Sequence, residues 1–381
     1  MSPTPKKINP HLLDEIKSYG AFDISACFNC GNCTAVCPLS KEENSFPRKM
    51  IRSGQIGIKE NLLNGVEPWL CYYCGECSET CPRQAEPGEY MAALRRYHIA
   101  ENDFLGLAKI LYRHPLIMII FTVFIAALLS FFLVGIKGDP EKFRQWIFSN
   151  LVAYEAIHLI GTIVGALGAL AMLSGVIIYF KRLTKERAFV FKGQIFSTCL
   201  FIFKEIMTMK RHGDCLDESS LTKRPWYLRP RFVHGFILWG FLSLLAATTF
   251  DFFFIYLLGT SFYFPARLTG TIGGLMLMYG VSVAIFERVR KHHRHSQHTH
   301  PADAWLLFFL FMLGFTGFWL EIVVMAEISG PLHYWILLLH AVMAIELIQL
   351  VAITKLAHAV YRPMALFIYH LQQKTKEINN V

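Results

Sequence analysis

Eight of the ten cysteines form two runs of identical spacing, C-x2-C-x2-C-x3-C-P. In bacterial ferredoxin runs of this kind, three thiolates bind one 4Fe-4S cubane and the fourth cysteine ligates the other cubane. The spacing therefore predicts two 4Fe-4S clusters with crossed ligands. Cluster one takes Cys27, Cys30, Cys33 and Cys81, and cluster two takes Cys71, Cys74, Cys77 and Cys37; Pro38 and Pro82 end the runs.

Zinc and disulfides are the alternative roles for these cysteines. Structural zinc also uses C-x2-C pairs, but it needs neither a third equal gap nor a following C-x3-C-P, twice over. Disulfides are disfavoured because the first long apolar run starts only near Pro115, so we expect no signal peptide and a reducing cytoplasmic compartment. Cys199 and Cys215 stand apart from both runs and are interpreted as ordinary or free thiols.

Five of the fifteen histidines lie within or at the ends of apolar runs: His158, His234, His340 and His358, and His333 at an outer boundary. Ionisable groups are costly inside a membrane and are functional candidates there, although an interhelical hydrogen bond is the alternative role of each. At about 1.5 Å per residue, His234 and His358 lie roughly 5 Å from the cytoplasmic ends of their runs, and His158 and His340 roughly 31–33 Å. These depths predict an inner b haem on His234 and His358 and an outer one on His158 and His340.

Helix geometry adds two expectations about these histidines. His340 and His358 are 18 residues apart, which is five turns of one helix and places them on one face. Gly161, Gly165 and Gly168 follow His158 and could let a porphyrin lie against the helix, or could equally serve helix–helix packing.

Long apolar helices must position these side chains. The chain is 54% hydrophobic and only 17% charged, whereas soluble domains carry about 25% charged residues. Six runs reach the roughly 20 residues that a membrane-spanning helix needs: 115–136, 151–180, 231–258, 267–287, 303–327 and 333–361. We predict a mostly α fold, in which a helical ferredoxin-type iron–sulfur domain (residues 1–113) precedes a six-span cytochrome b-like bundle (residues 114–381).

Basic residues gather on one side of the predicted bundle. Residues 1–113 hold 13 Lys and Arg against 13 Asp and Glu, so the net charge of +9 lies in the bundle, which points to a membrane surface rather than to nucleic acid. Links 181–230 and 288–302 and the tail 362–381 hold 18 Lys and Arg, link 137–150 holds three, and links 259–266 and 328–332 hold none. The positive-inside rule then places the iron–sulfur domain, the loop 181–230 and both termini in the cytoplasm, with the chain in the inner membrane.

The segment 189–210 is apolar but is interrupted by Lys192, Lys204 and Lys210. This pattern predicts an amphipathic helix at the membrane interface. A seventh span is the alternative.

Two such cysteine runs followed by His-bearing spans resemble the QmoC family, the membrane subunits of quinone-interacting membrane-bound oxidoreductase complexes. The 33 residues between Cys37 and Cys71 resemble the helical ferredoxin module of heterodisulfide reductase small subunits, and the second half resembles a nitrate-reductase-gamma-type cytochrome b. The resemblance implies two 4Fe-4S clusters, b haems, two flavin-containing partners similar to heterodisulfide reductase (QmoA- and QmoB-like), and a link between menaquinone and adenylylsulfate (APS) reductase.

One departure from the gamma-type pattern concerns the outer haem. In that family two histidines on one span face two on another, but here the third span has only His234, with Leu244 ten residues on. His158 would have to replace the missing ligand.

The candidate proton group for quinone is Glu155, which precedes His158 by three residues and shares its helix face. His333, Glu321 and Glu327 are expected at a similar level, whereas Lys355 and Arg231 mark an alternative site on the inner side. The outer side is favoured because ionisable groups gather there without an excess of fixed cations.

Three other functions are alternatives. The nearest is the membrane subunit of a heterodisulfide- or sulfite-linked redox complex. A transporter or anchor with a sensory iron–sulfur domain is disfavoured because the sequence shows no matched broken helices. A self-sufficient enzyme is disfavoured because no Gly-rich phosphate loop follows a strand. The direction of electron flow stays open.

Overall fold

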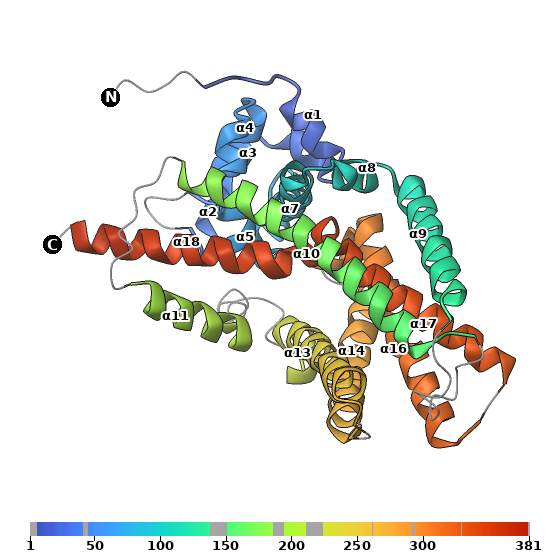
Figure 1. The fold of residues 1–381 in the computed structure, drawn as a ribbon. Coiled ribbons are helices and arrows are strands. Elements are labelled where there is room, and N and C mark those ends of the chain that lie inside the picture. Colours follow the sequence, from blue (N-terminus) through green and yellow to red (C-terminus); the bar gives the residue numbers. More distant parts are fainter. Residues whose placement is uncertain are drawn as a thin grey trace.

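The computed structural model describes residues 6–40, 45–137, 151–185, 194–210, 224–260, 262–291, 294–328 and 330–379. Within these ranges the chain is helical, and the described residues form no β-strand, only an isolated bridge between Ser18 and Gly20. The predicted mostly α fold is confirmed. Figure 1 shows the short N-terminal helices gathered at one end of the molecule and the long helices running away from them.

The described residues of the N-terminal part form eight α-helices, and the seventh of these lies at the centre. They are α1 (Leu12–Lys17), α2 (Asn32–Ala35), α3 (Arg48–Gln55), α4 (Lys59–Leu63), α5 (Glu67–Leu70), α6 (Glu76–Glu79), α7 (Pro87–Asn102) and α8 (Leu107–Arg113). Helix α7 is buried along most of its length, with Tyr90, Leu94 and Tyr97 fully enclosed. Burial lowers the pKa of His98 on this helix to about 4. The neutral ring lies 2.8 Å from the Leu62 carbonyl oxygen through Nε2, so this histidine serves the core.

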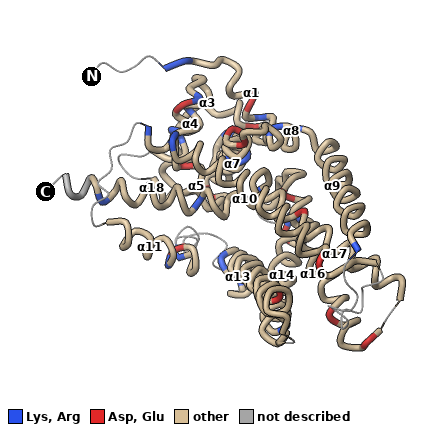
Figure 2. Tube along the Cα trace, viewed as in Figure 1, with Lys and Arg blue, Asp and Glu red and all other residues tan. Residues whose placement is uncertain are grey.

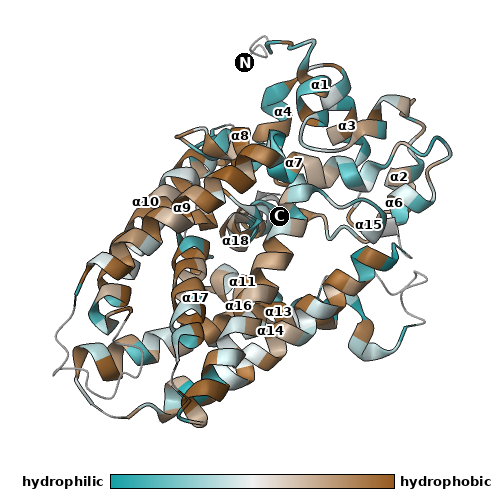
Figure 3. Cartoon of the chain, turned by 90° about the vertical axis from the view of Figure 1, so that its right-hand side faces the viewer, coloured by the Kyte–Doolittle hydropathy of each residue, from teal (hydrophilic) through white to brown (hydrophobic). Residues whose placement is uncertain are grey.

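Among the described residues, six helices are long and apolar enough to cross a membrane, as predicted. They are α9 (Pro115–Gly135), α10 (Tyr154–Thr184), α13 (Pro230–Asp251, continued by a π-helix, Phe252–Leu257), α14 (Phe264–Arg290), α16 (Pro301–Met325) and α17 (Pro331–Gln349, continued by the 3-10 turn Leu350–Ala352). Four of them begin with proline, which suits the first helical position because its missing N–H has no partner there in any case. Figure 3 shows that hydrophobic residues predominate along α9 and α10, and Figure 2 shows that charged residues concentrate on the N-terminal helices and at helix ends.

The sixth apolar run differs from its predicted form. The helix predicted over 333–361 ends at Gln349, and after a short turn Thr354 adopts an extended conformation with φ −109° and ψ −179°. A second 3-10 turn, Lys355–Ala357, leads into α18 (His358–Asn379). His340 and His358 therefore lie on two different helices, and the expectation that they share one helix face is wrong.

Helix α11 (Ile195–Thr208) corresponds to the predicted interfacial segment, whose first residues lie outside the described ranges. Its 14 residues span about 21 Å, which is short of the roughly 30 Å hydrocarbon core. Phe201 of α11 stacks on His370 of α18 with ring centroids 4.1 Å apart, while Phe196 is 82% exposed. An interfacial helix fits these contacts better than a seventh span does.

Glycines bring α13 and α14 into close contact. A Cβ added to Gly240 would lie 2.6 Å from the Leu277 backbone nitrogen, and one added to Gly280 would lie 2.9 Å from the Val233 carbonyl oxygen. Only residues without a side chain permit backbones to approach so closely in a membrane bundle. Gly168 of α10 has the same role, since its added Cβ would lie 2.9 Å from the Ile348 carbonyl oxygen.

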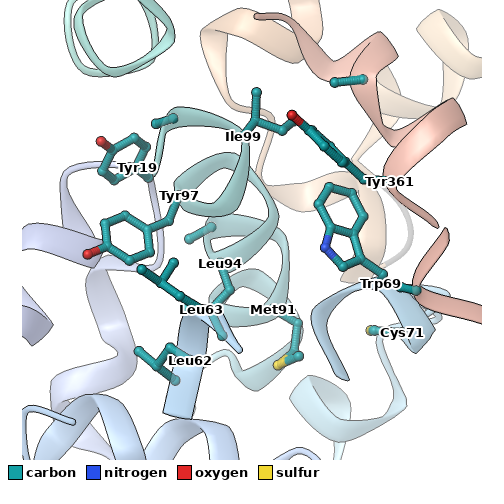
Figure 4. Close-up of a cluster of buried hydrophobic side chains, with 14 of the residues drawn as sticks. Tyr19, Leu62, Leu63, Trp69, Cys71, Met91, Leu94, Tyr97, Ile99 and Tyr361 are labelled. Carbon is teal, nitrogen blue, oxygen red and sulfur yellow. The ribbon is translucent and has the colours of Figure 1, made fainter. Parts of the chain in front are cut away.

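One hydrophobic core joins the N-terminal part to the bundle. Trp69 of α5 contacts Tyr361 of α18 with ring centroids 5.5 Å apart, and Tyr179 near the end of α10 contacts both rings. Figure 4 shows Tyr361 beside Trp69, close to Cys71. The predicted boundary at residue 113 therefore separates two parts of the sequence, but not two separate cores.

Candidate functional site

Both cysteine runs fold in the same way. Each opens into a loop with left-handed residues at matching positions, Asn29 and Gly31 in the first run and Tyr73 and Gly75 in the second. A one-turn helix, α2 or α6, follows each loop and carries the third cysteine. Left-handed residues turn backbone amides toward the loop interior, and the Tyr73 N–H donates to Cys71 Sγ at 3.3 Å. Such hydrogen bonds to sulfur are known to tune cluster potentials.

The thiols gather in two groups that correspond to the two predicted ligand sets. Burial raises the pKa of Cys33 to about 11, and the neighbouring thiols that raise it further are Cys27, Cys30 and Cys81. Burial likewise raises the pKa of Cys37 to about 12, with Cys71 and Cys74 as its neighbouring thiols. Burial raises the pKa of Cys77, and the thiols that raise it further are Cys71, Cys74 and Cys37, followed by Cys33 of the other set. Each run thus contributes three cysteines to one group and its last cysteine to the other.

The surroundings of the two groups differ. Around the first group, Cys30 is exposed and Phe28 is 61% exposed. An open groove of about 900 Å³ adjoins Cys27, and its described lining includes the cations Arg48, Lys49 and Arg52. The first group therefore faces outward.

The second group faces the bundle. Arg95 donates from Nη2 to the Cys71 carbonyl oxygen at 3.1 Å. The guanidinium carbon of Arg362 on α18 lies 3.9 Å from the centroid of the Tyr72 ring. Two cations thus stand beside the second group of thiols, where they would offset the negative charge of a bound cluster.

His234 of α13 and His358 of α18 lie side by side with ring centroids 6.1 Å apart. Metal–imidazole bonds of about 2 Å place the centroids of two imidazoles on opposite sides of one metal about 6 Å apart, so this pair fits bis-histidine ligation. The Nδ1 of His358 lies 2.5 Å from the Lys355 carbonyl oxygen. Donation from Nδ1 leaves the Nε2 lone pair available for a metal and fixes the ring, as is usual for metal-ligating histidines.

A buried ionic cluster supports the turn before His358. Asp303, at the start of α16, lies 2.9 Å from Lys355 Nζ and 3.3 Å from Arg96 Nη1 of α7. The Arg96 Nε–H donates to the Tyr19 carbonyl oxygen at 2.7 Å. The carboxylate of Asp303 therefore joins three segments: α7 of the N-terminal part, α16, and the turn that precedes His358.

The predicted outer pair is arranged differently. Gly161 of α10 packs against Ile345 of α17, so His158 and His340 lie at similar levels on neighbouring helices. Their side chains nevertheless have separate partners. His158 Nε2 lies 3.3 Å from Asp251 Oδ2, and His340 Nδ1 lies 2.9 Å from Thr316 Oγ1. The structure brings the inner histidines together and does not bring these two into ring contact.

The outer end also contains residues that the sequence did not single out. Asp251 accepts a hydrogen bond from the Tyr154 hydroxyl at 2.7 Å, next to its contact with His158. Tyr256, in the π-helix, packs on the His158 ring with centroids 4.8 Å apart. An acidic residue within the third apolar run was the available signal for Asp251. Glu155 lies on the same turn of α10 as Tyr154 and is partly buried.

The remaining candidates have ordinary surroundings. The Trp319 Nε1–H donates to His333 Nδ1 at 3.2 Å, and Glu321 pairs with Arg267 at 2.9 Å. Cys199 is an exposed free thiol on α11, and Cys215 lies outside the described residues.

Comparison with known proteins agrees with the geometry of the cysteine groups. A family model described as a 4Fe-4S dicluster domain matches residues 23–85, which contain all eight clustered cysteines. A protein of Archaeoglobus profundus, named as similar to a heterodisulfide reductase subunit, is 31% identical over 101 residues, covering 26% of this chain and 53% of that protein. The iron–sulfur subunit of the CoB–CoM heterodisulfide reductase of Methanopyrus kandleri is 28% identical over 71 residues, covering 16% of this chain and 37% of that protein. The chain thus spans about half the length, or less, of these curated relatives.

No solved structure matches the chain. The matched region and the six apolar helices together define the class of protein: a chain with a 4Fe-4S dicluster domain followed by six helices, among the described residues, that are long and apolar enough to cross a membrane. Its N-terminal region is a 4Fe-4S dicluster domain homologous to the iron–sulfur subunits of heterodisulfide reductases.

Proposed function

We propose that this chain is the membrane subunit of a quinone-linked oxidoreductase of the QmoC type. It exchanges electrons between menaquinone and flavoprotein partners by way of b haem and two 4Fe-4S clusters. When bound, the haem and the clusters carry single electrons. The chain holds these groups at fixed spacing and sets their surroundings, and the direction of flow follows from the potentials of the partners.

One observation carries the proposal. Arg362 follows the candidate haem ligand His358 by four residues, and its guanidinium lies on the ring of Tyr72, which is bonded to the cluster-two ligand Cys71. The inner histidine pair and cluster two are therefore neighbours through one turn of α18. This supports a route from the membrane to cluster two, then to cluster one, and from there to a partner.

The partners belong at the outward face of cluster one. Its groove carries Arg48, Lys49 and Arg52 beside Cys27, and basic rims favour acidic partner surfaces. We propose two flavin-containing subunits similar to heterodisulfide reductase (QmoA- and QmoB-like) there, with APS reductase as the soluble electron partner. A heterodisulfide- or sulfite-linked complex is the second candidate, because the matched relatives are named as heterodisulfide reductase subunits. Co-purification of the native complex distinguishes the two.

For the membrane side, we propose quinone exchange at the outer end of the bundle, with Glu155 as the proton group. The adjacent Tyr154–Asp251–His158 contacts supply further polar groups there. An outer haem on His158 and His340 remains part of the proposal, although each ring has another partner in this structure.

We further propose that the iron–sulfur domain and both termini are cytoplasmic, with the chain in the inner membrane. The first and last described helices lie toward the same end of the molecule, as an even number of spans requires (Figure 1). A reporter fused after residue 290 should read cytoplasmic, and one fused within 259–266 should read periplasmic. The opposite readings would mean that segment 189–210 crosses the membrane or that the whole orientation is inverted.

Quinol turnover tests the proposal as a whole. In the assembled complex, a water-soluble quinol analogue should reduce the clusters, and Glu155→Gln should slow this reduction by about 10²-fold, because positioned proton groups contribute at least that much. Glu60→Gln, at an exposed position of α4 in the N-terminal part, is the matched control and should leave turnover unchanged. Unchanged turnover in Glu155→Gln with full haem content would remove Glu155 from the site. Loss of turnover in Lys355→Met alone would move the site to the cytoplasmic side.

A further inference from the structure

A buried cation without a full set of partners lies beside the inner histidine pair. The Nη2 atom of Arg362 is inaccessible to solvent and has no hydrogen-bond partner among the described residues. An arginine keeps its charge in proteins, and a buried charged donor that is left unsatisfied is costly. An anionic hydrogen-bond acceptor next to this nitrogen would satisfy both its N–H donors and its charge.

The position of Arg362 connects it to the histidine pair. It follows His358 by four residues on α18, and residues four apart lie on the same helix face. Its ring contact with Tyr72 fixes the guanidinium between the histidine pair and the cluster-two loop.

Two other cations near the pair are already engaged. Lys355 Nζ lies 2.9 Å from Asp303. Arg231, on the first turn of α13, donates from Nε and Nη2 to the Thr208 carbonyl oxygen at 3.1 and 2.8 Å. Of these three cations, Arg362 is the one with a buried side-chain nitrogen that has no hydrogen-bond partner among the described residues.

We propose that Arg362 binds a propionate carboxylate of the porphyrin held by His234 and His358. This inference rests on the proposed haem at that pair and adds its orientation, with the propionate edge turned toward Tyr72 and Cys71. Arginine suits the role because its planar fork matches a carboxylate in two parallel hydrogen bonds, which lysine cannot reproduce. One side chain would then anchor the porphyrin and bridge the gap to cluster two.

The test compares haem with haem dimethyl ester, whose propionates carry no charge. Full-length protein is produced without haem, loaded with either porphyrin, and mixed with excess apomyoglobin while the Soret band reports haem loss. The wild-type protein should retain haem about tenfold longer than it retains the ester, equivalent to about 1.4 kcal/mol. In Arg362→Met this difference should disappear, and in Arg362→Lys it should shrink.

The control variant is Lys374→Met on the same helix, whose Nζ donates to Ser197 Oγ at 2.9 Å, far from the histidine pair. It should keep the wild-type difference between the two porphyrins. Iron–sulfur content reports folding in every variant, and Arg362→Gln replaces Arg362→Met if the latter does not accumulate. An undiminished difference in Arg362→Met or Arg362→Gln would overturn the propionate assignment. A wild-type protein that binds no b haem would instead overturn the proposed function. His358→Ala tests whether the bound haem depends on this histidine pair, and so distinguishes a wrong propionate assignment from a wrong haem site.

Discussion

Replacing Cys37 with serine is expected to abolish the cluster held by Cys71, Cys74 and Cys77 and to leave the other cluster in place. The fourth cysteine of a run ligates the opposite cubane, and Cys71 and Cys74 are the thiols that neighbour Cys37. The purified variant should contain about four of the roughly eight cluster irons. Iron analysis, with electron paramagnetic resonance of the reduced protein, measures the loss.

Two matched variants make this result decisive. Cys81→Ser is the mirror substitution and should remove the cluster held by Cys27, Cys30 and Cys33. Cys199→Ser, an exposed thiol on α11, should remove neither. If Cys37→Ser destroyed the Cys27 cluster and spared the other, the crossed ligation would be wrong.

His234→Ala and His358→Ala are each expected to remove the same b haem. The two rings lie 6.1 Å apart, and a bis-histidine site does not survive the loss of either ligand unchanged. With two haems bound, each variant should lose about half of the haem, and the pyridine haemochrome spectrum of purified protein measures this. His370→Ala, whose ring stacks on Phe201 of α11, is a control on the same helix as His358 and should keep full content.

The outer haem has its own outcome. His340→Ala should remove the second haem and spare the first. Full haem content in His158→Ala would eliminate that residue as a ligand, consistent with its contact to Asp251, and would make His333 the next candidate. If His234→Ala and His358→Ala removed different haems, the inner pair itself would be wrong.

The cysteine runs and the apolar runs show how much the sequence predicts. Ligand spacing within a run is a local property, so the repeated C-x2-C-x2-C-x3-C-P pattern was sufficient to predict the 4Fe-4S dicluster domain that residues 23–85 match. The crossed ligand sets stay a prediction. The six helices follow from run length, because a bilayer requires about 20 apolar residues per helix whatever the packing. The apolar segment that contains α11 is helical, and its place at the membrane interface stays a prediction.

Tertiary structure decided the features that depend on distant residues meeting. The break after Gln349 could not be predicted from the apolar run, because it depends on contacts with residues elsewhere in the chain. It allows Lys355 to reach Asp303 at the start of another helix, and the Lys355 carbonyl group to accept a hydrogen bond from His358. The partner of His158 was equally hidden, since Asp251 lies at the end of α13, far away in the chain.

The sequence by itself therefore determined the 4Fe-4S dicluster domain and the number of helices long enough to span a bilayer, which are set by ligand chemistry and by the bilayer as a solvent. Only the tertiary structure decided that α18 leaves the bundle and completes the core of the iron–sulfur domain through Tyr361 and Trp69. That packing places Arg362 on Tyr72 and so brings the helix that begins with His358 next to the loop of the second cysteine run. The physical reason is that periodicity and spacing describe one segment at a time, whereas these contacts join segments from opposite ends of the chain.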